Sequence, residues 1–500
     1  MTGSKPESQD HEERLLIDGR LTAAKSGATF NNINPATEEV MGVVADASAE
    51  DMDRAIAAAR KAFDKTDWAT NHAFRKKCLE QLHTAINEEK ELLRAELVAE
   101  VGAPITLTYG PQLDWPLSDG LLWPAQQIET YPWNRRISDQ TLGGGKPTCR
   151  WVWKEPIGVI AAVIPWNFPF EITINKIGPA LATGNTMIIK AATQTPWNAT
   201  RIGRLIAEKT EIPPGVVNVV TTQDHKVSNM LFTDSRVDMV SFTGSTATGR
   251  LLLEAAAPTF KRTLLELGGK SANILLDDCM FEKILPMSAA VSCMHAGQGC
   301  ALPTRLLLPR SRYETGVAIL NDAWKYVSCG DPNDINTIAG PLVTAMQRDR
   351  VLDFIEKGKA EGARLLKGGG RPKHLSRGWY VEPTLFVDVD NMSTIAQEEI
   401  FGPVLSVIPF DDDDDAIRIA NQNKYGLSGM VWSASTERAL NVARKIRTGS
   451  FMINGGNFYG AEAPYGGYRQ SGNGRQCGIE GFEQHLETKV VGSEFPLTGL

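Results

Sequence analysis

Short apolar segments alternate with helical segments from residue 157 onward, and this alternation constrains the fold most strongly. Strands are predicted at 159–164, 187–190, 216–220, 239–242 and 264–267, with helical segments at 176–181, 197–209 and 246–253. The pattern repeats after residue 269, with strands at 273–276 and 305–308 and helices at 284–294, 313–326 and 347–361. Wholly apolar strands separated by helices form parallel sheets that are covered on both faces. We therefore expect an α/β protein with two doubly wound parallel-sheet domains.

The first 153 residues follow a different pattern. Two helices are predicted, at 49–63 and 76–98, and a second apolar segment at 112–127 is expected to be partly helical. Residues 135–153 contain Gly143-Gly144-Gly145 and then alternate in polarity, which favours a β-hairpin. The first fourteen residues are polar and are expected to be disordered.

Composition narrows the possible partners and compartment. The 500 residues carry a net charge of −7 without a basic tail, which argues against nucleic acid or an anionic membrane as a partner. The longest apolar run, residues 157–164, is too short to span a bilayer, and the N-terminus lacks the apolar core of a signal peptide. Seven cysteines form no C-x-x-C pair and seven histidines show no metal-ligand spacing. We expect a cytoplasmic protein with free thiols and no metal site.

Three short stretches carry groups suited to acyl chemistry. Cys300 ends the stretch Gly297-Gln298-Gly299-Cys300, where small neighbours let a carbonyl approach the sulfur. Glu266 lies alone in an apolar run before Gly268-Gly269, and Asn167 lies between prolines and aromatic residues. A nucleophile, a base and an oxyanion donor are the minimum set for this chemistry. Taken singly, each has a structural alternative: a packed thiol, an ion-paired strand end and a turn residue.

Together these stretches resemble the aldehyde dehydrogenase superfamily, in the forms P-W-N-F-P, E-L-G-G-K and G-Q-x-C. Two further matches are Phe242-Thr243-Gly244-Ser245-Thr246 and Glu399-Ile400-Phe401-Gly402-Pro403. The five motifs occur in the family's order, and the resemblance extends from about residue 16 to about residue 491. It implies NAD(P)-dependent oxidation of an aldehyde to the carboxylic acid.

The resemblance assigns the catalytic roles. Cys300 would attack the aldehyde, the Asn167 amide and the Cys300 backbone N–H would hold the oxyanion, and a thioester on the sulfur would follow. Glu266 would then activate water, and its apolar neighbours should raise its pKa. Lys176 would lie near the thiol and help proton transfer, although a solvated helix lysine is the more common interpretation of such a residue.

The cofactor would be NAD or NADP. By the resemblance, the groove is formed by Ile164, Trp166, Lys190, Thr193, Gly244, Ser245, Leu267, Glu399 and Phe401. Many members that prefer NAD have a glutamate at the position of Thr193, which binds the ribose hydroxyls and repels a 2′-phosphate. Its absence predicts that NADP is accepted, unless Asp224 restores the repulsion.

The substrate tunnel would be lined by Phe168, Ile172, Tyr459 and Tyr465, with Trp115 and Leu121 as further candidates. None of these is a cation, and Glu171 near the mouth would repel a carboxylate. An apolar aliphatic or aromatic aldehyde is therefore expected, although several of these side chains could simply belong to the core.

The resemblance also implies a domain organisation and an assembly. Residues 1–133 and 154–267 would form the dinucleotide-binding domain and 268–470 the catalytic domain. Residues 134–153 and 471–500 would form a small β oligomerisation arm and the C-terminal tail, giving a homodimer or homotetramer. Two other functions stay open: a CoA-acylating dehydrogenase, which Glu266 disfavours, and a non-catalytic cofactor-binding protein on the same fold.

Overall fold

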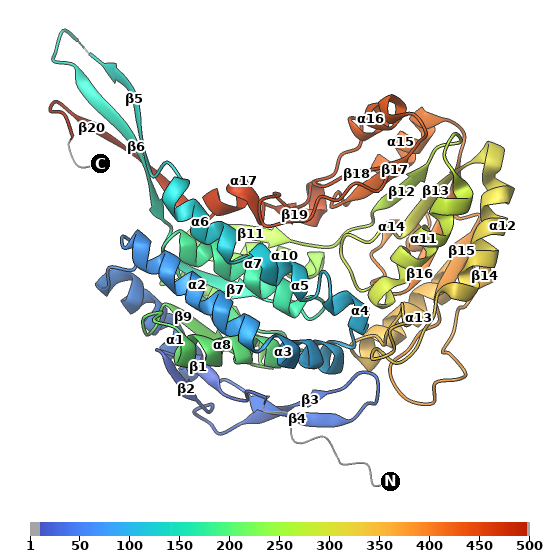
Figure 1. Ribbon diagram of the computed structural model, residues 1–500, viewed down its shortest axis with the longest axis horizontal. Coiled ribbons are helices and arrows are strands. Elements are labelled where there is room, and N and C mark those ends of the chain that lie inside the picture. The colour runs from blue at the N-terminus through green and yellow to red at the C-terminus, as the bar shows by residue number, and fades with distance from the viewer. Residues whose placement is uncertain (1–10, 142, 498–500) are drawn as a thin grey trace.

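Two large β-sheets, each covered by helices, lie side by side, and a three-stranded sheet projects from one end (Figure 1). The structure is a computed structural model that describes residues 11–141 and 143–497. Most of the predicted N-terminal leader therefore lies outside the described residues. Its last residues are not disordered as expected, because Glu12 is 4% exposed and its backbone oxygen accepts a 2.7 Å hydrogen bond from Thr200.

The first sheet has eight strands in the order β19-β11-β10-β7-β8-β9-β1-β2. Its five central strands are parallel, and antiparallel strands close both edges. This confirms the predicted doubly wound sheet. The strands are β1 (Leu15–Ile17), β2 (Arg20–Thr22), β7 (Val159–Val163), β8 (Thr186–Lys190), β9 (Val217–Val220), β10 (Met239–Thr243), β11 (Arg262–Glu266) and β19 (Gly472–Asn473).

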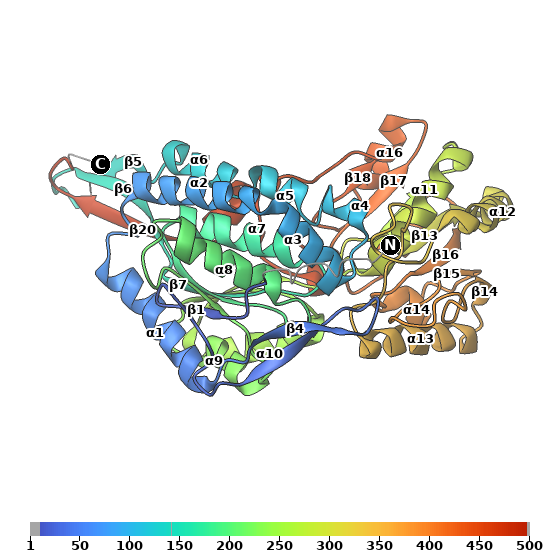
Figure 2. The same ribbon diagram turned by 60° about the horizontal axis from the view of Figure 1, so that its bottom comes forward.

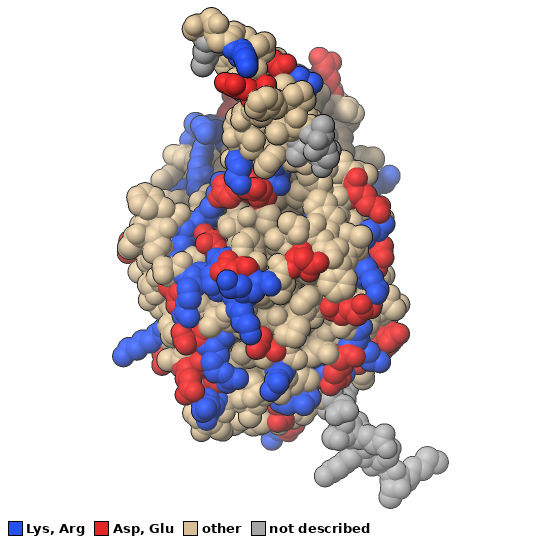
Figure 3. All heavy atoms as spheres, turned by 90° about the vertical axis from the view of Figure 1, so that its left-hand side faces the viewer, with Lys and Arg blue, Asp and Glu red and all other residues tan. Residues whose placement is uncertain are grey.

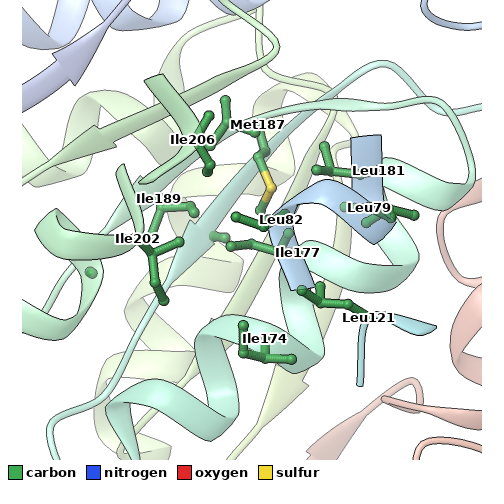
Figure 4. Close-up of a cluster of buried hydrophobic side chains, with 14 of the residues drawn as sticks. Leu79, Leu82, Leu121, Ile174, Ile177, Leu181, Met187, Ile189, Ile202 and Ile206 are labelled. Atoms are coloured by element: carbon green, nitrogen blue, oxygen red, sulfur yellow. The ribbon is translucent and has the colours of Figure 1, made fainter. Parts of the chain in front are cut away.

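Alternate side chains of the central strands enter two separate cores. In β7, Val159, Ala161 and Val163 belong to the core under α1 (Ala49–Lys65), α9 (His225–Thr233) and α10 (Thr246–Ala256). Ile160 and Ala162 face the opposite core, under α2 (His72–Glu88), α7 (Pro169–Ala182) and α8 (Trp197–Lys209). Side chains of α2, α7, α8 and β8 converge in that core (Figure 4). Figure 2 shows the helices on both sides of the sheet. Burial of each aliphatic side chain there stabilises the folded state by about 1.5–3 kcal/mol. The packed core therefore holds the strands, and with them the strand ends at which the site lies, in fixed positions.

Two helical segments differ from the prediction. The single helix expected at 76–98 is broken at Glu89 into α2 and α3 (Lys90–Glu96), followed by a π-helix at Leu97–Val101. The break lets the Glu89 carboxylate accept hydrogen bonds from Arg201 at 2.7 Å and Arg204 at 2.5 Å. Helix α9 was not predicted from the sequence, and it is capped by Asp224, whose side chain accepts a hydrogen bond from the Lys226 N–H.

The second sheet has seven strands in the order β14-β15-β16-β13-β12-β17-β18 and is parallel except for β14. The predicted second α/β sheet is thus confirmed. Its strands are β12 (Ala272–Leu275), β13 (Arg305–Pro309), β14 (Arg364–Lys367), β15 (Thr384–Val387), β16 (Val404–Phe410), β17 (Gly429–Trp432) and β18 (Met452–Ile453). Its helices are α11 (Phe281–Cys293), α12 (Tyr313–Ala323), α13 (Ala345–Ala360), α14 (Thr394–Gln397), α15 (Asp413–Asn421) and α16 (Thr436–Ala443).

The projecting sheet has the order β20-β6-β5, and the hairpin predicted near residues 135–153 forms its β5 and β6. These strands are β5 (Asn134–Gln140), β6 (Thr148–Pro156) and β20 (Leu486–Ser493). A further hairpin pairs β3 (Thr29–Ile33) with β4 (Val40–Ala45). The remaining short helices are α4 (Ile105–Thr108), α5 (Asp114–Asp119), α6 (Leu122–Thr130) and α17 (Gly478–Glu483).

The molecular face beneath the projecting sheet carries charges of both signs (Figure 3). Lysine and arginine side chains alternate there with aspartate and glutamate, so this face has no continuous basic field. Within residues 11–141 and 143–497, no helix is long and apolar enough to cross a membrane.

Candidate active site

The first sheet reverses its strand order between β7 and β10, which creates a crevice at the carboxyl ends of these strands. From β7 the chain continues to β8 on one side, whereas β10 lies on the other side. Ligands of open α/β sheets bind at such a switch point. The segment Ile164-Pro165-Trp166 follows β7 there, and Gly244-Ser245 follows β10.

The turn between β10 and α10 suits an anionic group. Ser245 caps α10 by accepting a hydrogen bond from the Thr248 N–H at 3.1 Å, so the helix begins at the crevice with its amide-rich end. Thr243 Oγ1 is buried and bonds to no described residue. A Cβ on Gly249 would lie 2.8 Å from Leu267, so glycine lets α10 pack closely on β11. These features fit the pyrophosphate of a dinucleotide.

Lys190 lies at the end of β8, beside the same crevice. Burial lowers the pKa of Lys190 to about 8, and the nearby charge of Asp46 opposes this shift. Thr193 follows in the turn after β8 and is half-buried. Asp224 is engaged as the cap of α9, whereas Asp46 accepts a 2.9 Å hydrogen bond from the Gln223 N–H. Sequence reasoning missed Asp46, because only the folding of β4 against the end of β9 brings it here.

Glu399 reaches across from the second sheet to the glycine turn after β11. Its Oε1 accepts a 3.1 Å hydrogen bond from the Gly269 N–H, and a Cβ on Gly268 would lie 2.2 Å from its Oε2. Burial raises the pKa of Glu399 to about 7, and the hydrogen bond from Gly269 lowers it. The rings of Trp166 and Phe401 meet edge to face at 5.3 Å. Together they form a cradle at the junction of the two sheets that fits the nicotinamide end of a dinucleotide.

The backbone before Cys300 is held in an uncommon conformation. His295 and Ala296 have φ of 53° and 51°, a left-handed region that costs non-glycine residues about 1–2 kcal/mol each. Gly297 follows at φ 73°, and a Cβ there would lie 1.9 Å from the Gly402 carbonyl oxygen. The loop therefore presses against the segment that carries Glu399, which fixes the sulfur relative to the groove.

Asn167 is tied to this loop through hydrogen bonds on both of its sides. Its Nδ2 donates to the Gln298 carbonyl at 3.0 Å. Its own carbonyl accepts from Gln112 at 2.8 Å and lies 3.1 Å from Nε2 of His295. Asn167 is 5% exposed, and its amide is aimed at the backbone two residues before Cys300. Such a preorganised amide can serve an oxyanion. Gln112 and His295 support it and were not assigned roles from the sequence.

The Cys300 thiol is half-buried and lies 3.3 Å from the Tyr465 hydroxyl. Burial raises the pKa of Cys300 to about 12, and the hydrogen bond to Tyr465 lowers it. The carboxylates of Glu399, Glu266 and Glu171 raise it further. The thiol is therefore protonated near neutrality and needs a base to become a nucleophile.

Glu266 is a buried ionisable group whose charge acts on the thiol, and Lys176 is a second one whose charge acts on Glu266. Glu266 is 3% exposed, and neither carboxylate oxygen accepts a hydrogen bond from a described residue. Burial raises the pKa of Glu266 well above its usual range, against the charges of Lys176 and Arg475. Burial also lowers the pKa of Lys176 to about 7, and its Nζ donates to Ser241 at 2.9 Å. Lys176 can therefore exchange a proton near neutral pH, and the raised pKa makes the Glu266 carboxylate a stronger base than an exposed one.

The residues predicted to line the substrate tunnel divide into two sets. Tyr459 and Trp115 are exposed, and their rings lie 5.9 Å apart. Ile172 and Leu121 are 8% and 1% exposed and belong to the apolar core, and Figure 4 shows Leu121 among its side chains. Phe168 packs partly against that core and meets the His295 ring edge to face at 5.5 Å.

Two ionisable groups lie near Tyr459: Glu171, which the sequence analysis placed near the tunnel mouth, and Cys477, to which it gave no role. Tyr459 donates a short hydrogen bond to Glu171, and burial raises the pKa of Glu171 to about 7. Cys477 is half-buried on the segment after Gln476, whose backbone pairs with Tyr465 at 2.7 Å in both directions. Burial raises the pKa of Cys477 to about 12, and the charges of Glu171 and Glu266 raise it to a smaller extent.

Comparison with known proteins decides the family. The model of the aldehyde dehydrogenase family matches residues 21–491. A 3-succinoylsemialdehyde-pyridine dehydrogenase from a Pseudomonas species is 41% identical over 486 residues, which are 97% of this chain and 98% of that protein. The chain belongs to the aldehyde dehydrogenase family.

A solved structure and a second relative, both aldehyde dehydrogenases, show which cofactors such enzymes use. A variant of aldehyde dehydrogenase C from Pseudomonas syringae, in complex with NAD⁺ and octanal, matches with a TM-score of 0.90 at 37% identity, over 100% of both chains. The NADP/NAD-dependent aldehyde dehydrogenase PuuC of Escherichia coli (strain K12) is 36% identical, over 96% of this chain and 95% of that protein. The protein is an NAD(P)-dependent aldehyde dehydrogenase. Among the residues that the structure describes, no group of three or more metal-ligating side chains occurs.

Proposed function

We propose that Cys300 is the nucleophile and Glu266 the base of this aldehyde dehydrogenase. The observation that carries the proposal is the buried Glu266 carboxylate, which has no protein hydrogen-bond partner among the described residues and lies close enough to raise the Cys300 pKa. A carboxylate with a raised pKa is a stronger base toward the hydrolytic water than an exposed one, and Lys176, whose pKa is about 7, helps to take up the thiol proton. The thiolate then adds to the aldehyde carbon, and the oxygen takes the negative charge.

Asn167 and the Cys300 backbone N–H hold this oxygen in the proposed mechanism. The Asn167 amide donates to the Gln298 carbonyl at 3.0 Å in the structure, so it is already directed at the loop. When bound, the dinucleotide in the crevice accepts the hydride. The remaining thioester on Cys300 is hydrolysed by a water that Glu266 deprotonates. Lys176 lies within electrostatic range of Glu266 and passes the proton onward.

The cofactor residues are proposed from the crevice. Gly244 and Ser245 would bind the pyrophosphate, Lys190 the adenosine ribose, and Glu399 the nicotinamide ribose. Ile164, Leu267, Trp166 and Phe401 would form its walls. Thr193 leaves room for a 2′-phosphate, and Asp224 is engaged in capping α9, so use of NADP is expected. Asp46, through its charge beside Lys190, favours NAD.

The proposed substrate is an aldehyde with an apolar aliphatic or aromatic body. The aromatic side chains Tyr465 and Tyr459 lie near the thiol, and Phe168 lies beside His295. Ile172 is 8% exposed, so only a small part of its side chain would contact the substrate. Glu171 disfavours a substrate carboxylate through like-charge repulsion.

Cys300→Ala tests the proposed function. NAD(P)H formation from aldehydes should be lost in this variant, while Cys477→Ala should retain it. Full activity of Cys300→Ala would refute the mechanism. Addition of CoA tests the CoA-acylating alternative, because a CoA requirement would mean that a thiol rather than water resolves the thioester. Binding of NAD⁺ without turnover of any aldehyde would favour the non-catalytic alternative.

Assembly and location are also proposals. The outer strands β5 and β20 of the projecting sheet offer backbone groups to a second subunit, which supports a homodimer or homotetramer. The proposed arm comprises residues 134–153 and the C-terminal tail, although β19 pairs with the large sheet. All seven cysteines are free, which supports a reducing cytoplasmic location. A monomer by light scattering at micromolar concentration would refute the assembly.

A further inference from the structure

The loop that carries Cys300 holds Asn167 from two sides. The Nδ2 atom of Asn167 donates a 3.0 Å hydrogen bond to the carbonyl of Gln298. The backbone carbonyl of Asn167 lies 3.1 Å from Nε2 of His295, which belongs to the same loop. Both the side chain and the backbone of Asn167 are therefore attached to the segment that ends in the nucleophile. This attachment keeps the amide and the sulfur in a fixed relative position.

One N–H of the Asn167 amide is left free by this arrangement. A primary amide has two N–H donors in one plane, and the Gln298 carbonyl occupies one of them. No other group of a described residue accepts a hydrogen bond from Asn167 Nδ2. Because the first bond fixes the plane of the amide, the free N–H has a fixed direction too. A donor that is already oriented stabilises an oxyanion without rearranging as the charge develops.

His295 donates its hydrogen bond to Asn167, because a carbonyl oxygen has no proton to give. The proton is therefore on Nε2, and the ring is neutral near pH 7 because burial lowers the pKa of His295 to about 4. Its other nitrogen, Nδ1, is buried and forms no hydrogen bond with a described residue. His295 is thus placed to orient a neighbour rather than to transfer a proton.

Gln112 is the second donor to the Asn167 carbonyl, at 2.8 Å. It lies between α4 and α5 and therefore outside the loop of Cys300. Among the described donors to this carbonyl, only His295 connects it to that loop. Loss of the His295 bond would leave the buried carbonyl with one partner, and the Asn167 backbone would be free to shift relative to the sulfur.

We propose that His295 is a positioning residue that keeps the free N–H of Asn167 directed at the oxygen of the aldehyde that Cys300 attacks. The inference rests on the proposed function, in which the Asn167 amide holds this oxygen. In this role His295 acts only through Asn167. Removing the His295 N–H should therefore weaken the stabilisation of the oxyanion and leave the acidity of the thiol unchanged.

A matched pair of variants isolates the His295 N–H. His295→Leu removes the donor, whereas His295→Gln keeps an N–H donor, and both side chains meet the same backbone cost at φ 53°. At saturating NAD⁺, the kcat/KM of His295→Leu for an aldehyde should fall roughly tenfold, which is the effect of one lost hydrogen bond. His295→Gln should restore most of this loss. An unchanged kcat/KM in His295→Leu, or an equal loss in both variants, would overturn the proposal.

Asn167→Ala shows whether His295 acts through the amide. This variant alone should lower kcat/KM by roughly 10²- to 10³-fold, and adding His295→Leu to it should cause no further loss. A further loss as large as that of His295→Leu alone would overturn the proposal, because His295 would then act on another group. Iodoacetamide should alkylate Cys300 at the wild-type rate in His295→Leu, and slower alkylation would also overturn it. Full activity of Asn167→Ala would refute the oxyanion role in the proposed function itself.

Discussion

Replacing Tyr465 with phenylalanine should make the Cys300 thiol less acidic. The substitution removes one oxygen, 3.3 Å from the sulfur, and keeps the ring that stacks on Phe458. Burial raises the pKa of Tyr465 well above its usual value, so its hydroxyl stays protonated and donates to the thiolate. A hydrogen bond to a charged group contributes about 1 kcal/mol more than one to a neutral group. Its loss should therefore raise the Cys300 pKa by roughly one unit.

Alkylation by iodoacetamide, followed on the Cys300 peptide by mass spectrometry, measures this change. The thiolate fraction should fall about tenfold, and the greater nucleophilicity of the more basic sulfur offsets about threefold of this. At a fixed pH near neutrality, alkylation should therefore slow about threefold in Tyr465→Phe. Tyr459→Phe is the matched control, because its hydroxyl bonds Glu171 instead. Equal or faster alkylation of Tyr465→Phe would show that the hydroxyl does not stabilise the thiolate.

Three other substitutions have defined outcomes. Glu266→Gln should lower steady-state turnover about 10²- to 10⁴-fold while a stopped-flow burst of NADH persists, and loss of the burst would show that Glu266 acts earlier. Gly297→Ala should lower the free energy of unfolding by about 2–5 kcal/mol in denaturant titration, because its Cβ would lie 1.9 Å from the Gly402 oxygen; unchanged stability would contradict this packing. Thr193→Glu should shift the kcat/KM ratio toward NAD⁺ by about a hundredfold, and a wild type without NADP turnover would exclude Thr193 as the determinant.

The sheets could be predicted because their strands are short, wholly apolar and bounded by turns. The predicted ends of β8 and β10 lie within one residue of the observed ends. A short, wholly apolar segment between turns is best explained as a strand that is buried on both faces. The break at Glu89 could not be predicted, because it depends on Arg201 and Arg204, more than a hundred residues away. Helix propensity alone continues through that position.

The site divides in the same way. Cys300, Glu266 and Asn167 lie in short local motifs, and the fold brings their segments to one junction between the sheets. The groups that hold them come from distant segments: Gln112 and His295 bond the Asn167 carbonyl across 55 and 128 positions. Asp46 reaches the site through hydrogen bonds that residues 45–47 form with residues 221–223, and Cys477 through the backbone bridge between Gln476 and Tyr465. Single-sequence patterns contain no signal for such contacts.

The covalent intermediate tests the central claim most directly. Glu266→Gln is mixed with an aldehyde and NAD⁺, quenched in acid within the first turnover, and digested for peptide mass spectrometry. The mechanism predicts the acyl group of the substrate on the peptide that contains Cys300, in an amount equal to the NADH formed. An unmodified Cys300 accompanied by NADH formation, or an acyl group on Cys477 instead, would contradict the assignment of Cys300 as the nucleophile.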